Sequence, residues 1–181
     1  MNNNNKPLLK LVFSGAFLAL CMVLPLLTGQ IPEIGSRLSP MHIPVLLCGF
    51  ICGWPYGLAV GLIAPLMRTL IFGMPPLFPV SAAMVFELGA YGLASGLLYK
   101  LLPKKLPSIY AALIVSMLVG RIVWGGAMAS FALLGIRGMM FPFSAFIAGA
   151  FTNAVPGIIL HIILIPPLVA ALKRARLSFN E

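Results

Sequence analysis

Three charged side chains, those of Arg68, Glu87 and Arg121, lie within stretches that are otherwise almost entirely apolar. Placing one charge at the centre of a bilayer costs at least ~2.5 to 3.5 kcal/mol on insertion scales, so such residues mark a functional site or a buried ion pair. Arginine presents a fork of N–H donors that matches a carboxylate or a phosphate. Because one carboxylate neutralises only one of the two arginines, an anionic or strongly hydrogen-accepting ligand is favoured.

Aromatic side chains accompany these charges at helical spacing. Tyr91 follows Glu87 by four residues, and Trp124 follows Arg121 by three, so each pair shares one face of a helix. An acid, two guanidinium groups, an amide and two aromatic rings then form one pocket that opens to the outside. The residues predicted to bind substrate are Arg68, Glu87, Tyr91, Arg121, Trp124, Asn153 and His42.

The asparagine and the two histidines are placed by their local sequence. Asn153 lies just before Pro156 and Gly157, where an interrupted helix would expose backbone groups to a ligand. His42 starts an apolar segment at the predicted outer surface, where it joins the pocket or is satisfied by water. His161 falls toward the opposite half and is predicted to be a packing residue, so the two histidines are expected on opposite sides of the membrane.

An alternative arrangement gives the charges a purely structural role. In it, Arg68 and Glu87 form a buried ion pair, and Arg121 reaches a helix end or a loop carbonyl. Charged residues inside membranes do pair with one another, and not every pair contacts a substrate.

The composition requires a membrane protein to position these residues. The chain has 181 residues, of which 61% are hydrophobic and 8% charged, and the apolar residues come in runs. Because about 20 residues are needed to cross ~30 Å of hydrocarbon, we predict an all-α integral membrane protein with a single transmembrane domain over residues 1–181. Six spans are expected, at about Leu8–Leu27, Pro40–Gly53, Tyr56–Phe72, Pro79–Leu102, Leu106–Leu134 and Pro142–Leu172.

The basic residues cluster at span ends that would lie on one side of a six-span protein. Lys6, Lys100 and Lys173 represent the three clusters, and the positive-inside rule then predicts that both termini are cytoplasmic. This placement explains the net charge of +9 without nucleic acid binding. With this topology, Arg68, Glu87, Arg121 and Asn153 all fall in the outer half of the bilayer, at about 1.5 Å per residue.

Several classes of chemistry are excluded by what the sequence lacks. Only three acidic residues are present, so paired-carboxylate catalysis is not expected within one chain. P-loop, serine-hydrolase and zinc-protease motifs are also missing. We therefore predict no enzymatic activity, no cofactor and no metal site. Cys21, Cys48 and Cys52 lie within spans and are predicted to be small apolar core residues.

Small residues at four-residue spacing predict close helix packing. Gly15 and Ala19 form such a pair in the first span, and Gly57 and Gly61 form another in the third. In lipid, small residues let helix backbones approach closely, within the fold or with a partner helix.

Two stretches carry a resemblance to a known family. Residues 43–49 (IPVLLCG) and 53–61 (GWPYGLAVG) are similar to the proline- and glycine-rich second and third helices of the substrate-binding S components of energy-coupling factor (ECF) vitamin transporters. Gly15 and Ala19 match the family's small-residue motif on the first helix, where most members have alanine at both positions. Pro65 differs from the acidic residue found there in many relatives. The resemblance covers essentially the whole chain.

The resemblance implies a transport role in a bacterial cytoplasmic membrane. An S component captures a vitamin from outside, associates with a transmembrane coupling subunit and two ATPase subunits, and is thought to topple in the membrane. Gly15 and Ala19 would dock on the coupling subunit, and the loops after the first, third and fifth helices would be the gates. Other functions that remain are a stand-alone secondary carrier or channel for a small anionic solute, and a membrane scaffold.

Residue types leave the ligand open. Two arginines suit a carboxylate such as pantothenate or nicotinate, whereas Glu87 with Trp124 and Tyr91 suits a nitrogen heterocycle such as pyridoxine or a deazapurine.

Overall fold

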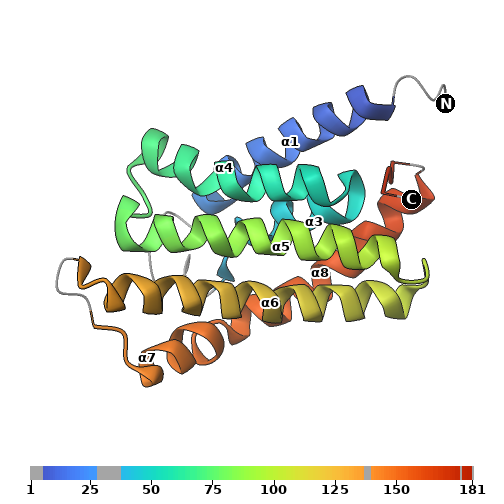
Figure 1. Cartoon of the computed structure of the whole chain (residues 1–181). Helices are drawn as coiled ribbons and strands as arrows, with labels where there is room; N and C mark the ends of the chain where they lie inside the picture. The colour runs from blue at the N-terminus through green and yellow to red at the C-terminus, as the bar shows by residue number, and fades with distance from the viewer. Residues whose placement is uncertain (1–5, 28–37, 137–139, 176, 181) are drawn as a thin grey trace.

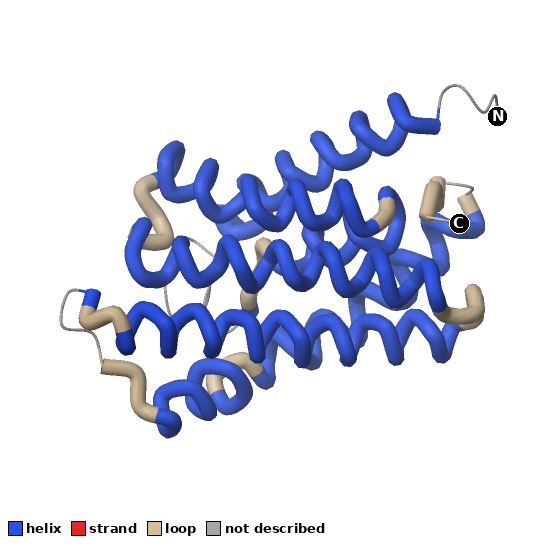
Figure 2. Tube along the Cα trace, viewed as in Figure 1, coloured by secondary structure: helices blue, strands red, loops and turns tan. Residues whose placement is uncertain are grey.

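A computed structural model describes residues 6–27, 38–136, 140–175 and 177–180. Every regular element in these ranges is helical, as Figure 2 shows, which confirms that the fold is all-α. The elements are α1 (Lys6–Leu27), α3 (His42–Cys52), α4 (Trp54–Phe72), η2 (Leu77–Ser81), α5 (Ala82–Leu101), α6 (Leu106–Leu133), α7 (Phe143–Ile147), η4 (Ala148–Thr152) and α8 (Val155–Arg174).

Five helices are long and apolar enough to cross a membrane, which makes the chain a multi-pass membrane protein. They are α1, the η2–α5 unit (Leu77–Leu101), α4, α6 and α8. Helices α4, α5 and α6 lie side by side along most of their lengths (Figure 1). The predicted first, third, fourth and fifth spans match these helices to within about two residues at each end.

The second predicted span, Pro40–Gly53, also matches its helix, α3, to within two residues at each end, and this short helix lies at the centre of the bundle. The 11 residues of α3 rise only about 16 Å at about 1.5 Å per residue, roughly half of the hydrocarbon thickness. All of them are buried, and α3 packs against α1, α4, α5 and α8. A helix enclosed by protein needs no lipid-facing surface, so it can begin inside the membrane without leaving backbone groups exposed to lipid.

Glycine determines how closely α4 and α5 approach. A Cβ atom added at Gly57 would lie 2.6 Å from the carbonyl oxygen of Gly92, and one added at Gly61 would overlap the carbonyl of Leu88. The predicted close packing at Gly57 and Gly61 is therefore confirmed, with α5 as the neighbour. By contrast, a Cβ atom added at Gly15 on α1 would meet nothing within 4 Å.

The sixth predicted span is wrong in its first part. Instead of one helix from Pro142, the chain forms the short α7 and the single turn η4, and the membrane-length helix α8 begins only at Val155. Proline lacks an N–H and is favoured in the first turn of a helix, where no intrahelical acceptor is needed. Pro156 occupies this position in α8 and so accounts for the late start.

The start of α1 and the end of α8 lie at the same end of the bundle (Figure 1). The segment 177–180 returns into the helices: the Phe179 N–H donates to the Ile51 carbonyl at 2.8 Å. The Asn180 side-chain amide donates to the carbonyls of Gly49 and Gly96, at 3.2 and 2.9 Å. This tail thereby satisfies backbone acceptors where α3 ends inside the protein.

The three cysteines pack as predicted. Cys21, Cys48 and Cys52 are free thiols and fully buried. The Cys21 thiol lies 3.7 Å from the Met41 carbonyl, and that of Cys48 lies 3.6 Å from the Ser14 hydroxyl, so they join α1 to the central helix.

Candidate ligand-binding site

The carboxylate of Glu87 is the centre of a buried polar cluster. Glu87 is 2% exposed, and its Oε1 atom lies 2.9 Å from Arg121 Nη1. The Tyr91 hydroxyl donates to the same oxygen at 3.4 Å. His42 Nε2 lies 3.4 Å from it. Three of the predicted site residues thus surround the fourth, although their role in binding stays a prediction.

Three helices position this cluster. Glu87 and Tyr91 are one turn apart on α5, so their side chains share the face that packs on α3 and α6. Gly120 on α6 lies against the Tyr91 ring, where an added Cβ atom would come within 2.7 Å of a ring carbon. This close approach brings the next residue, Arg121, to the Glu87 carboxylate.

The third of these helices, α3, begins at the level of the carboxylate. His42 is its first residue, so the positive end of the α3 dipole lies beside Glu87. In many membrane transporters, a short helix begins inside the membrane with its N-terminus pointing at the bound solute.

His161 belongs to the same cluster, and its predicted placement was wrong. Its ring lies 6.1 Å from that of His42, with an angle of 23° between the planes, and it is 3% exposed. The two histidines are therefore neighbours and not on opposite sides of the membrane. The error came from starting the last span at Pro142; the signal that could have corrected it was Pro156, which marks the true start of α8.

Some polar atoms of the cluster have no hydrogen-bond partner. They are His42 Nδ1, His161 Nε2 and Arg121 Nε, and His42 Nε2, 3.4 Å from Glu87 Oε1, makes no hydrogen bond either. Buried polar atoms in native proteins are almost always satisfied by protein, water or a ligand. These atoms are therefore available to hydrogen-bond water or a polar solute.

Arg68 lies elsewhere and pairs differently from either predicted arrangement. Its Nη1 atom donates to the Met22 carbonyl of α1 at 3.0 Å, and its guanidinium lies 5.1 Å from the centre of the Phe72 ring. Among the described residues, Glu87 forms its ion pair with Arg121, and no ion pair involves Arg68. The alternative Arg68–Glu87 pair is thus wrong: the two arginines have exchanged the roles assigned to them.

Trp124 and Asn153 are not part of the buried cluster. The Trp124 ring contacts that of Phe141, with 5.7 Å between centres, and lies over Gly149. Asn153 stands at the predicted break before α8, with an exposed side chain. Trp124 thus packs on the segment that precedes α8, and among the described residues neither Trp124 nor Asn153 forms a hydrogen bond or an ion pair with Glu87.

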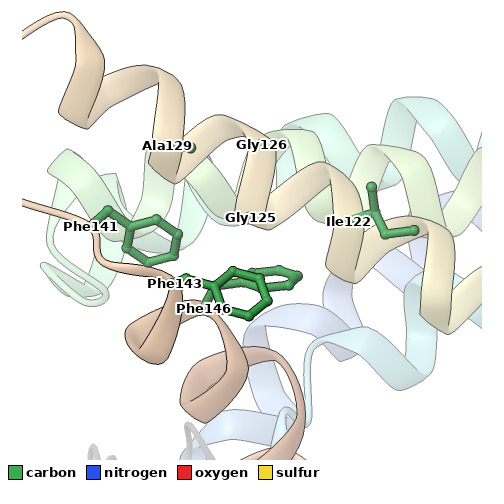
Figure 3. A pocket seen from close by; sticks show the side chains of 7 residues that line it. All are labelled: Ile122, Gly125, Gly126, Ala129, Phe141, Phe143 and Phe146. Atoms are coloured by element: carbon green, nitrogen blue, oxygen red, sulfur yellow. The ribbon is translucent and has the colours of Figure 1, made fainter.

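An apolar pocket lies between α6 and the segment that contains α7 (Figure 3). Its volume is about 420 Å³, and its lining contains no charged side chain. Three phenylalanine rings face glycines of α6 across it, as the figure shows. The lining residues are Ile122, Gly125, Gly126, Ala129, Phe141, Phe143 and Phe146.

Comparison with known proteins defines the class to which this bundle belongs. The family model of the ECF transporter substrate-specific component matches residues 9–169. The chain is therefore a member of the ECF transporter S-component family, and its role is substrate binding for transport, not enzymatic catalysis. No curated protein and no solved structure matches the chain significantly.

Proposed function

We propose that this S component captures a small water-soluble vitamin or vitamin precursor in the cluster around Glu87. The observation that carries the proposal is the buried Arg121–Glu87 pair with His42 and Tyr91 in contact with the carboxylate. Burying a salt bridge costs desolvation energy that the pair itself barely recovers. A structure that needed only apolar packing would gain little from such a cluster, whereas a solute-binding site requires it.

The orientation of the chain follows from its charges. Lys104, between α5 and α6, and Lys173, in the last turn of α8, lie together, and the Lys173 ammonium donates to the Lys104 carbonyl at 3.0 Å. The connection between α5 and α6 is at the end of the bundle where α1 begins (Figure 1). By the positive-inside rule this end faces the cytoplasm. Glu87 lies near the start of α5, so the site then opens toward the outer side.

The partners are a transmembrane coupling subunit and two ATPase subunits. Support for a docking face comes from α1, where Gly15 and Ala19 are exposed and no atom of the described residues lies within 4 Å of a Cβ atom added at Gly15. Around them the exposed surface is apolar and includes Leu11, Val12 and Leu20. Small residues on an otherwise bulky apolar face permit close approach by a partner helix.

Binding and transport should separate when the subunits are reconstituted. The chain alone, purified in detergent, should retain a solute that mass spectrometry identifies, and that solute should bind again after removal. Liposomes with the chain alone should not accumulate it, because nothing in this chain hydrolyses ATP. Adding the coupling subunit and ATPases should give ATP-dependent uptake. Accumulation by the chain alone would show a stand-alone carrier instead, and absence of any bound solute would favour a scaffold.

Bulky residues on α1 should prevent assembly and leave binding intact. Gly15→Leu and Ala19→Leu place a large side chain where close helix contact is proposed, and at Gly15 the chain itself has room for it. We expect at least a tenfold loss of co-purified coupling subunit and of uptake, with unchanged solute affinity. Gly126→Leu is the matched control, because Gly126 on α6 also has nothing within 4 Å of an added Cβ atom. Normal assembly of both α1 variants would refute this docking face.

A further inference from the structure

Two buried imidazole nitrogens are left without partners at the centre of the proposed site. They are His42 Nδ1 and His161 Nε2, on residues that are 4% and 3% exposed. The rings are stacked 6.1 Å apart, and the Tyr91 ring lies edge-on to His42 at 5.1 Å. These atoms come from α3 and α8, which meet only through tertiary packing, so the fold brings them together.

The neighbours of each ring determine which nitrogen carries the proton. A neutral imidazole has one N–H donor and one acceptor. His42 Nε2 faces the Glu87 carboxylate, which can only accept, so the proton belongs there and Nδ1 is an acceptor. The His161 ring hydrogen-bonds the backbone carbonyl of Ser39, which also accepts from the backbone N–H of His42 at 3.0 Å. Because the other ring nitrogen of His161 donates to this carbonyl, the unpaired Nε2 of His161 is the acceptor.

The charges of the cluster are already balanced. Glu87 and Arg121 are 2.9 Å apart and cancel each other, and Arg68 is bound to the Met22 carbonyl. An anionic ligand would lose its hydration here without gaining a free cation. An uncharged ligand would lose less hydration free energy on moving from water into the site, provided that its polar groups find hydrogen-bond partners there.

We infer that this site takes an uncharged ligand that presents two N–H or O–H donors, which His42 Nδ1 and His161 Nε2 accept, together with one acceptor for Arg121 Nε. His161 is thereby a ligand-binding residue, in addition to those predicted from the sequence. The inference rests on the proposed function and specifies its substrate class. Hydroxylated or amino-substituted heterocycles fit this pattern, whereas simple carboxylates do not.

Ligand chemistry gives the first test, with the full chain in detergent after removal of bound solute. Pyridoxine and nicotinamide are neutral probes with donors, and nicotinate and pantothenate are anions. By isothermal titration we expect at least one neutral probe to bind, at least tenfold more tightly than either anion. Tighter binding of an anion that still depends on Glu87 would overturn the inference and leave the proposed function standing. No binding by any probe, and no co-purified solute, would overturn both.

Substitution of His161 gives the second test, measured with the tightest probe or the co-purified solute. His161→Gln can place an oxygen near the Nε2 position and should keep affinity within about threefold. His161→Asn is equally polar but too short, and His161→Leu has no acceptor, so both should lose at least tenfold. Thermal unfolding of each variant without ligand identifies the variants that fold. Equal affinity of the folded Gln and Asn variants and the wild type would refute the role of His161.

Discussion

Replacing Arg121 with alanine is expected to lower ligand affinity at least a hundredfold. The substitution removes the cation 2.9 Å from Glu87 and leaves a carboxylate that is only 2% exposed without a countercharge. Breaking a buried pair in this way costs about 3 to 5 kcal/mol. A hundredfold corresponds to about 2.7 kcal/mol, just below that range, so a loss of at least a hundredfold is expected. Isothermal titration with the co-purified solute measures it.

Two further variants separate loss of binding from loss of folding. The double variant Glu87→Gln with Arg121→Leu removes both charges, so it should unfold at a higher temperature than Arg121→Ala while still failing to bind. Arg68→Ala is the matched control, because Arg68 is also a buried arginine but bonds to Met22 and not to Glu87. It should reduce thermal stability and keep affinity within about threefold. If Arg68→Ala abolished binding and Arg121→Ala did not, the site would have to be reassigned.

Substituting Gly92 with alanine is expected to prevent most of the protein from folding. The added Cβ atom would overlap the carbonyl of Gly57 on α4, so relief requires the α4 and α5 backbones to separate. Overpacking against side chains already costs about 1 to 3 kcal/mol. Here the obstacle is backbone, and we expect more than about 3 kcal/mol from a total stability that is typically about 5 to 15 kcal/mol.

The yield of monodisperse protein and its thermal unfolding temperature measure this effect. Gly126→Ala is the control, since nothing lies within 4 Å of its added Cβ atom and alanine favours a helix over glycine. It should fold at least as well as the wild type. Comparable yields of Gly92→Ala and Gly126→Ala would show that the helices do not pack as closely as described.

Helix positions were predictable because long apolar runs bounded by Gly, Pro and Lys leave few choices for a membrane protein. The contact of Glu87 with Arg121 was also within reach: counting residues from the two span ends placed both in the outer half, and the structure joins them. Helical spacing likewise predicted that Tyr91 would share the face of Glu87.

Errors arose where tertiary packing or one helix boundary decided the outcome. The start of α8 moved from Pro142 to Val155, and this single boundary brought His161 beside His42 and left Asn153 exposed. Which arginine pairs with Glu87 depends on how α4 and α6 are rotated about their axes, and the sequence pattern alone does not determine that rotation. The bounds of α3 were predicted to within two residues, but its enclosure by other helices was not, because an apolar segment fits a buried helix and a lipid-facing one equally well.

The location of the bound solute tests the central claim most directly. Native mass spectrometry can compare its occupancy in Glu87→Gln, which changes the buried cluster, and in Gly126→Leu, which fills the apolar pocket of Figure 3. Glu87→Gln keeps the size of the side chain but removes the charge that Arg121 and His42 face. We predict that Gly126→Leu retains the solute at wild-type occupancy and that Glu87→Gln loses it. Retention by Glu87→Gln with loss from Gly126→Leu would contradict the account and place the ligand between α6 and α7.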